Sequence, residues 1–335
     1  MSANPSTSGY PFLTSAAANL INAFAADEHK KKYLPAMFDG RFSGTMAMTE
    51  PDTGSSLGDL TTKATPHEDG SYRIRGQKMY ISGGDQDITE NIVHLVLARI
   101  EGAPQGAKGI SLFIVPKIHT NDDGSLGEAN DVKLVGLLHK MGYRGTTSTV
   151  LQFGDNNQCQ GFLIGEANHG LKYMFKMMNN ARLGVGVEGL AVSERSIQLA
   201  SDYAQERRQG RAVGSPAGEQ SLIIDHADVR RMLLTMRAYT DAMRGVLYLN
   251  AACLDIARNH SDEDIAQAAS DRAELLTPIS KGWCTDTIGM MVNTSPRTIT
   301  MMCMLIQILL AAAKRDAAPA EGRSCTVSTA SSIGA

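Results

Sequence analysis

The chain has 335 residues, of which 43% are hydrophobic and 20% are charged, a composition that suits a globular protein with a large buried core. Its formal net charge of −3 does not favour binding to nucleic acid or to an anionic membrane. The five cysteines are scattered, with no CxxC pair and no histidine at metal-ligand spacing, which argues against a disulfide framework or a zinc site and favours reduced thiols in the cytoplasm.

The first part of the chain has helical features. The opening residues, MSANPSTSGYPF, lack a basic region followed by an apolar one, so no signal peptide is evident. In residues 13–38 apolar side chains recur at helical spacing, and a charged turn and Pro35 follow. We expect short helical elements here.

Residues 43–155 have the character of strands. SYRIRGQKMYISGG alternates apolar and polar residues, whereas NIVHLVLARI and KGISLFIVPKI are short apolar runs bounded by turn residues. Between them, residues 119–132 (HTNDDGSLGEANDV) form a polar segment typical of a loop. The pattern predicts five to seven strands of an antiparallel β-domain.

The rest of the chain is predicted to be helical. Apolar residues recur every three to five positions in residues 170–209, a second stripe occupies residues 226–259, and a more polar helix is expected over residues 262–276. Glycines inside the first of these helices allow a neighbour to approach closely. A late apolar run at residues 298–313 is too short to span a bilayer. The order of helix, β-domain and helical bundle indicates an α+β fold with segregated elements.

Three segments offer chemistry. In MAMTEPDTGSSL (residues 46–57) a strand-like run breaks at Pro51 and Gly54 into a turn with four hydroxyls, which can hold a polar ligand or be a solvated loop. KMYISGG (78–84) ends a strand with an aromatic ring, a hydroxyl and two glycines. ERRQGR (206–211) ends a long helix with three arginines, which can stabilise the helix C-terminus or clamp a phosphate. The usual nucleotide and nucleophile signatures are absent from the sequence.

In chain order, these segments resemble the acyl-CoA dehydrogenase family of flavoproteins. MTEPDTGSS is similar to the flavin-adjacent turn of that family, and KMYISGG to the strand end that packs against the isoalloxazine ring. NNARLGVGVEGLAVSERSIQLASDYAQERRQGR resembles the helix and turn that begin its C-terminal bundle. TENIVHLVLARI, NDDGSLGEANDVKLVGLLHKMG and YMFKMMNNARLGVG point to the large subset that includes 3-methylmercaptopropionyl-CoA dehydrogenase. The resemblance covers residues 15–285, approximately.

The resemblance implies an acyl-CoA dehydrogenase-like fold. We expect a remnant of an N-terminal helical domain in residues 1–40 and a β-barrel-like middle domain in residues 41–160. An incomplete C-terminal helical bundle would occupy residues 165–286, and an atypical tail residues 287–335. Because the family pattern begins late and stops near residue 287, we hypothesise a fragmentary or frame-shifted gene product.

The resemblance also implies an FAD site. Met48 and Thr49 would contact FAD, and Ser55 would contact both FAD and the acyl-CoA substrate. Tyr80 would cover one face of the flavin, with Ser82 hydrogen-bonding at its edge.

Further positions match residues of the helical domain in the family. Arg182 matches an arginine near the acyl-CoA, whereas Arg207 and Gln209 match residues that reach the FAD diphosphate of a neighbouring subunit. A homodimer or a dimer of dimers is therefore expected. Thr53 and Ser56 stand where alanine and aspartate are usual, and neither change removes a hydrogen-bond donor.

The family reaction requires a carboxylate that removes the α-proton while a hydride leaves the β-carbon for flavin N5. The resemblance places this base in a YEGT-like turn after an HGGMG-like stretch, and the sequence beyond residue 287 contains neither. Some relatives carry the acid on the first bundle helix, where this chain has Ala181. The catalytic residue is thus not identified from the sequence.

The expected activity is FAD-dependent α,β-dehydrogenation of a short or thioether-containing acyl-CoA, with electrons passing to an electron-transfer flavoprotein. Such a role would belong to fatty acid or dimethylsulfoniopropionate metabolism. Two alternatives stay open. One is a catalytically inactive fragment that only binds FAD or acyl-CoA or associates with other subunits. The other is a flavin oxidase or monooxygenase on the same fold.

Overall fold

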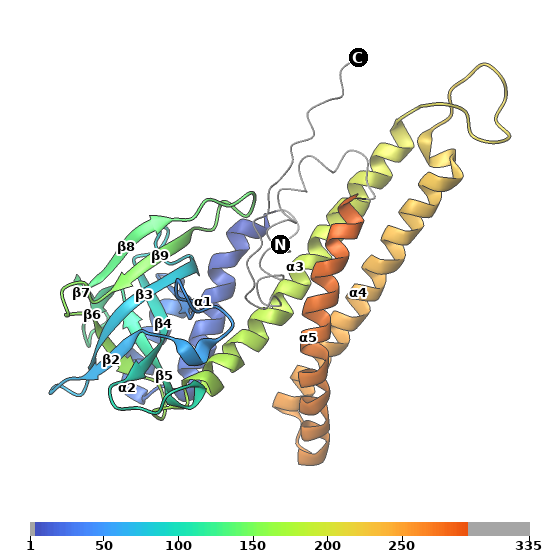
Figure 1. Ribbon diagram of the computed structural model, residues 1–335. Coiled ribbons are helices and arrows are strands. Elements are labelled where there is room, and N and C mark those ends of the chain that lie inside the picture. The colour runs from blue at the N-terminus through green and yellow to red at the C-terminus, as the bar shows by residue number, and fades with distance from the viewer. Residues whose placement is uncertain (1–3, 294–335) are drawn as a thin grey trace.

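The computed structural model describes residues 4–293 (Figure 1). A β-domain is covered on one side by two helices and followed by three long helices. The helices are α1 (Pro5–Phe24), α2 (Asp27–Phe38), α3 (Gly170–Glu206), α4 (Ala227–Asn259) and α5 (Glu263–Asn293). The α+β order predicted from the sequence is confirmed, and the helix predicted over residues 226–259 is α4 to within one residue at its start.

The β-domain contains ten strands among the described residues, more than the five to seven predicted. They are β1 (Phe42–Ala47), β2 (Lys63–Pro66), β3 (Tyr72–Ser82), β4 (Asn91–Ile100), β5 (Ile110–Pro116), β6 (Ile118–Thr120), β7 (Leu126–Ala129), β8 (Val132–Leu137), β9 (Ser148–Phe153) and β10 (Gln160–Leu163). Residues 4–293 also contain the single-turn helices η1 (Leu57–Asp59), η2 (Ala107–Gly109) and η3 (Ile223–Asp225).

Most strand pairings are antiparallel, as predicted, but two of them are parallel. Strands β1 and β2 each pair with β4 in parallel, and the other pairings are antiparallel. The main sheet runs β1-β4-β5-β10-β3-β9-β8, and β2 joins β3 to β4. Strands β4, β5, β10, β3 and β2 thereby complete a closed circuit of strand pairs.

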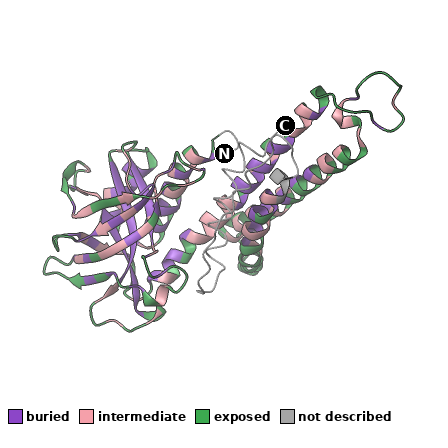
Figure 2. Ribbon diagram, turned by 45° about the horizontal axis from the view of Figure 1, so that its top comes forward, coloured by how far each residue is buried: buried purple, intermediate pink, exposed green. Residues whose placement is uncertain are grey.

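The continuous apolar runs in β4 and β5 are explained by burial on both faces. In β4, Val93, Leu95 and Leu97 pack against α1, α2 and the start of α3, whereas Val96 and Ala98 point into the interior of the β-domain. Figure 2 shows buried residues along the central strands and on the helix faces that cover them. A strand buried on both sides needs no polar alternation.

Two segments predicted as irregular are ordered. The charged stretch before Pro35 is the first half of α2 rather than a turn, and Asp27 and Glu28 lie in its first turn, where negative charge stabilises a helix. Residues 119–132, predicted as a loop, contribute to the β6–β7 hairpin and reach the start of β8.

The three long helices pack around a separate apolar cluster, in which Leu190 and Ile197 of α3 meet Met243 and Leu247 of α4. Helix α5 continues to Asn293, well beyond the third helix predicted from the sequence. The apolar run at residues 298–313 lies outside the described residues. Within residues 4–293, no helix is both long and apolar enough to cross a bilayer.

Candidate cofactor site

The turn that follows β1 is closed by its own backbone. The Glu50 N–H donates to the Thr53 carbonyl at 2.9 Å, and the Thr53 N–H donates back to the Glu50 carbonyl at 3.1 Å. Pro51 lies between them, where its fixed φ suits a turn. The half-buried Met48 side chain packs against the cluster beneath α1 and α2. The turn is thus anchored on the helix-covered side of the sheet.

The second segment is a bulge in β3. Lys78 pairs with Leu151 of β9 and Ile81 pairs with Thr149, so two residues of β3 face only one of β9. The bulge places Tyr80 at a φ of 59°, a left-handed conformation that is uncommon for a bulky residue. Tyr80 is 45% exposed, so a ligand can reach this residue from solvent. Strain of this kind concentrates at functional sites.

Three hydrogen bonds join the turn to the bulge. The Lys78 ammonium donates to the Met48 carbonyl at 3.0 Å and to Glu50 Oε1 at 3.0 Å. The Met79 N–H, which the bulge turns away from β9, donates to the Thr49 carbonyl at 2.9 Å. We call these three contacts the turn–bulge clamp. Through the clamp, Met48 and Thr49 are held beside the bulge that carries Tyr80.

The centre of the clamp is a buried ion pair. Lys78 has no exposed side-chain surface, and Glu50 is 3% exposed. The Glu50 carboxylate also accepts the N–H and hydroxyl of Thr61, at 2.6 and 2.7 Å, and those of Thr62, at 3.0 and 2.6 Å. Burial raises the pKa of Glu50, but Lys78 and the threonine donors outweigh burial and bring this pKa to about 2. Burial lowers the pKa of Lys78 to about 8 against the opposing attraction of Glu50. Both groups are therefore charged at neutral pH.

The remaining predicted residues lie at varying distances from the clamp. Ser55 is exposed in the segment after the closed turn, and the half-buried Ser82 pairs in register with Ser148 at the end of β3. Arg182 lies in the first half of α3 and donates to Asn179 Oδ1 at 3.2 Å.

Arg207 and Gln209 are not brought near the clamp. Both are exposed and follow the end of α3 at Glu206, so the arginines of this segment lie beyond the helix rather than inside it. At 1.5 Å per residue, Arg207 is about 37 Å along α3 from Arg182. Figure 1 shows this end of α3 directed away from the β-domain.

The described chain has two buried carboxylates, Glu50 and Glu188, and neither was predicted as a site residue. Glu188 lies on α3 and accepts a hydrogen bond from the Tyr143 hydroxyl at 2.8 Å. Burial raises the pKa of Glu188, so its carboxylate is a stronger base than that of Glu50. The sequence did contain a signal for Lys78, because the alternation of β3 places it on the same face as Ile74, where a lysine requires a buried acidic partner.

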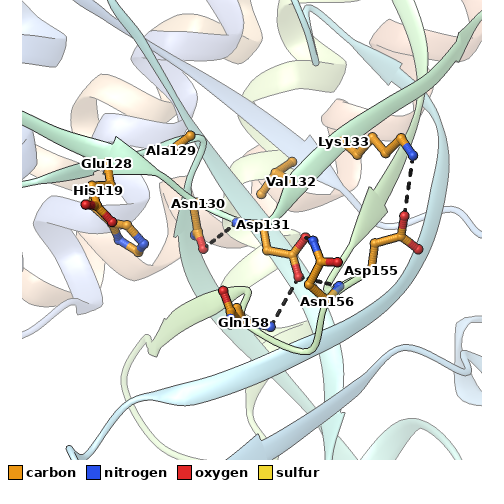
Figure 3. Close-up of a pocket in the computed structure, with 10 residues that line it drawn as sticks. All are labelled: His119, Glu128, Ala129, Asn130, Asp131, Val132, Lys133, Asp155, Asn156 and Gln158. Carbon is orange, nitrogen blue, oxygen red and sulfur yellow. Dashed lines mark hydrogen bonds and ion pairs between the residues drawn. The ribbon is translucent and has the colours of Figure 1, made fainter.

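A polar hollow elsewhere in the β-domain is distinct from the candidate site (Figure 3). It is lined mainly by residues of β7, β8 and the turn before β10, and none of the predicted site residues lines it. Asp131 accepts the N–H groups of Asn156 at 2.7 Å and Gln158 at 3.2 Å and thereby holds this turn. Within the described part of the chain, no group of histidine, cysteine and carboxylate side chains could hold a metal ion.

The fold and the site define a β-domain with a clamped, ligand-accessible turn joined to a helical bundle, and comparisons with known proteins give the family. The model for the acyl-CoA dehydrogenase middle domain matches residues 45–156, and the model for its C-terminal domain matches residues 168–270. Together these matches span more than half of the 335 residues. The chain belongs to the acyl-CoA dehydrogenase family, as the resemblance predicted.

Among curated relatives, 3-methylmercaptopropionyl-CoA dehydrogenase of Ruegeria pomeroyi is 44% identical over 276 residues, covering 82% of this chain and 46% of the relative. Butyryl-CoA dehydrogenase of Syntrophomonas wolfei is 37% identical over 290 residues, covering 85% and 48%. The chain thus spans about half the length of these relatives.

Solved structures share the fold. Caenorhabditis elegans ACDH-11 in complex with C11-CoA superposes with a TM-score of 0.74 at 22% identity, covering 92% of this chain and 50% of that chain. Acyl-CoA dehydrogenase from Bacillus anthracis in complex with FAD superposes with a TM-score of 0.67 at 21% identity, covering 88% and 48%. These likenesses confirm the predicted fold class.

Proposed function

We propose that this chain binds FAD and an acyl-CoA thioester and takes part in α,β-dehydrogenation of the acyl group to the enoyl-CoA. The observation that carries the proposal is the turn–bulge clamp. It brings Met48, Thr49 and the exposed ring of Tyr80 together within the part of the chain that matches the family's middle domain. These are three of the residues that the sequence resemblance assigns to the flavin.

The residues present fit a flavin. The exposed Tyr80 ring offers an aromatic face for stacking, while Ser55 and Ser82 offer hydroxyl groups that donate or accept hydrogen bonds. Met48 and Thr49 supply a backbone whose position is fixed by the clamp. When bound there, FAD would supply the acceptor for the hydride that leaves the β-carbon.

The protein's part in the reaction is to orient the thioester and to accept the α-proton. Ser55 and Arg182 are the residues proposed to contact the acyl-CoA. Glu50 is unsuited as the base because five donors occupy its carboxylate and its pKa is about 2. The acid that some relatives carry on α3 is Ala181 in this chain, so the general base stays unassigned.

Association between copies is part of the proposal. Arg207 and Gln209 follow the end of α3 that is directed away from the β-domain and its clamp, so they would serve the FAD diphosphate in a neighbouring subunit. The bundle exposes large apolar side chains, and Leu234, Tyr248 and Leu275 are each at least 65% exposed. Exposed apolar surface of this kind favours burial against another chain. A homodimer or a dimer of dimers would bury it.

The substrate and acceptor are proposed from the relatives. Similarity to a 3-methylmercaptopropionyl-CoA dehydrogenase and to butyryl-CoA dehydrogenases supports a short or thioether-containing acyl chain, and with it a role in dimethylsulfoniopropionate or fatty acid metabolism. An electron-transfer flavoprotein is the proposed acceptor. Three buried free cysteines among the described residues are compatible with the reducing conditions of the cytoplasm.

A second candidate function is flavin or acyl-CoA binding without catalysis. Ala181, at a position where some relatives carry the acid, favours this alternative. Such a chain would keep the cofactor site and lose proton abstraction.

The test begins with the visible absorption spectrum of the purified chain supplied with FAD. 3-Methylmercaptopropionyl-CoA and butyryl-CoA are then added separately without oxygen. Bound flavin that bleaches, with formation of enoyl-CoA, supports dehydrogenation. Bound flavin that stays oxidised supports the non-catalytic alternative. Absence of flavin binding, in a chain whose fold is verified by circular dichroism, contradicts dehydrogenation and non-catalytic flavin binding, and only acyl-CoA binding would then be left of the second candidate.

A further inference from the structure

We propose that the buried Glu50–Lys78 ion pair is a positioning device for the flavin site, which holds the backbone of Met48 and Thr49 against the bulge that carries Tyr80. This inference rests on the proposed FAD binding. It assigns a role to two residues that the family resemblance left without one. Glu50 and Lys78 would act through the segments they join rather than by touching the cofactor.

Stability alone is a weak explanation for this pair. Removing two charges from water is costly, and a well-packed apolar pair of similar size is often as stable or more so. Lys78 is nevertheless fully buried, and Glu50 nearly so. The geometry of the pair points to a different use, because its contacts join three separate segments of the chain.

The first step is the fixing of Glu50. The four donors from Thr61 and Thr62 hold both carboxylate oxygens before Lys78 is considered. These threonines follow η1 and precede β2, which is paired on both sides in the β-domain. Glu50 is therefore attached to the rigid part of the domain, and the turn around it cannot move independently.

The second step is the direction of the Lys78 ammonium. The Lys78 ammonium is held by Glu50 Oε1 and also donates to the Met48 carbonyl. This one buried cation therefore fixes the backbone at Met48, two residues before Glu50. Charge-assisted hydrogen bonds are stronger and shorter than neutral ones. The position of Met48 is thus set from β3, although Met48 itself follows β1.

The third step is the bulge. Lys78 is the last residue of β3 in register with β9 before the bulge, and the next N–H, that of Met79, is taken by the Thr49 carbonyl. If the turn shifted, this N–H would lose its partner, at a cost comparable to a lost hydrogen bond. The left-handed conformation of Tyr80 therefore depends on the turn.

The test compares FAD affinity in the full chain with Lys78→Met and Lys133→Met. Lys78→Met keeps the length of the side chain and removes both donated bonds, and Glu50 retains its four threonine donors. Lys133 is the matched control, because it is a lysine of the same domain that forms an ion pair at the surface. Both Lys133 and its partner Asp155 are exposed. FAD affinity is measured by quenching of flavin fluorescence, and the fold by urea unfolding.

We expect Lys78→Met to weaken FAD binding about tenfold or more, which corresponds to one charge-assisted hydrogen bond, and to alter the fine structure of the flavin absorption band. Lys133→Met should bind FAD as the unmodified chain does. Unchanged affinity and spectrum in a folded Lys78→Met variant would overturn the positioning role.

A double variant, Glu50→Gln with Lys78→Met, covers the case in which the single variant does not fold, because it leaves no unpaired buried charge. The expected result is recovered resistance to urea with FAD affinity still reduced. Recovery of both would reduce the pair to a structural role. If the unmodified chain itself fails to bind FAD, the proposed function is refuted, and the positioning role with it.

Discussion

Glu50 should make the β-domain sensitive to acid in a way that a single substitution removes. Its folded pKa is about 2, against an ordinary value of 4.5, so the ionised carboxylate stabilises the fold above pH 4.5. This stabilisation is lost as the pH falls toward 2. The difference between the two pKa values corresponds to about 3 kcal/mol, of which roughly 2 kcal/mol disappears between pH 6 and pH 3.

The assay compares the unmodified chain with Glu50→Gln by amide hydrogen exchange of peptides covering residues 48–62 and 78–82. Comparison at the same pH cancels the intrinsic exchange rate. Tryptophan fluorescence would not serve, because Trp283 lies in the helical bundle. The protection lost through Glu50→Gln should be roughly 30-fold greater at pH 6 than at pH 3, the ratio equivalent to about 2 kcal/mol.

The control is Asp155→Asn, which removes a half-exposed carboxylate from the same domain. Exposed ion pairs contribute little, so its effect on protection should be small at both pH values. A loss of protection in Glu50→Gln that is equal at pH 6 and pH 3 would contradict the electrostatic reasoning. The contribution of Glu50 would then come from packing alone.

Two further predictions concern α3 and the helices around it. A Cβ on Gly189 would lie 2.9 Å from the Cys284 carbonyl oxygen, so Gly189→Ala should destabilise the bundle by about 1–2 kcal/mol. Gly245→Ala, at an open helical position, should stabilise the bundle by up to about 1 kcal/mol. Urea unfolding followed by tryptophan fluorescence measures the free energy of unfolding of both variants. Equal changes in that free energy would contradict the packing argument. Because burial raises the pKa of Glu188, its ionised form is disfavoured in the fold, and stability falls as the pH rises above its ordinary value of 4.5. Glu188→Gln, which can still accept from Tyr143, should therefore raise the melting temperature at pH 7.5 and lose that gain near pH 4, whereas a gain independent of pH would refute this account.

The sequence predicted the elements whose patterns are local. The position of α4 followed from the helical periodicity of its apolar stripe, and the positions of β4 and β5 from short apolar runs bounded by turn residues. The parallel pairing of β1 and β2 with β4 could not be predicted in this way. It depends on contacts between segments that are distant in sequence, and strand periodicity is the same in parallel and antiparallel pairs.

The candidate site was only partly visible for a similar reason. Motif resemblance drew attention to Met48, Thr49 and Tyr80, but the ion pair that joins them spans 28 residues of sequence. Glu50 beside a proline reads as an ordinary turn residue. The alternation of β3 places Lys78 on the same face as Ile74 and so indicates a buried lysine, but the pattern does not say which carboxylate is its partner.

The end of α3 is directed away from the β-domain that carries Tyr80, and this leads to a final prediction about how a complete site is assembled. If Arg207 serves the flavin of a neighbouring subunit, each site contains Tyr80 from one chain and Arg207 from another. Chains carrying Tyr80→Ala alone, or Arg207→Ala alone, would have a defect in every site, and both preparations should bind FAD weakly. In a symmetric dimer formed from equal amounts of the two variants, about a quarter of the sites would contain neither substitution. Tight FAD binding should therefore reappear in about a quarter of sites after the two variants are unfolded and refolded together.

The control is the same experiment with Tyr80→Ala and Lys78→Met, because both of these changes lie in the same half of the site. Mixed dimers of these two variants contain a defect in every site, so no tight FAD binding should return, whichever chain Arg207 serves. Absence of recovery with Arg207→Ala, in a preparation verified to contain mixed dimers, would assign Arg207 to its own chain or to no site at all.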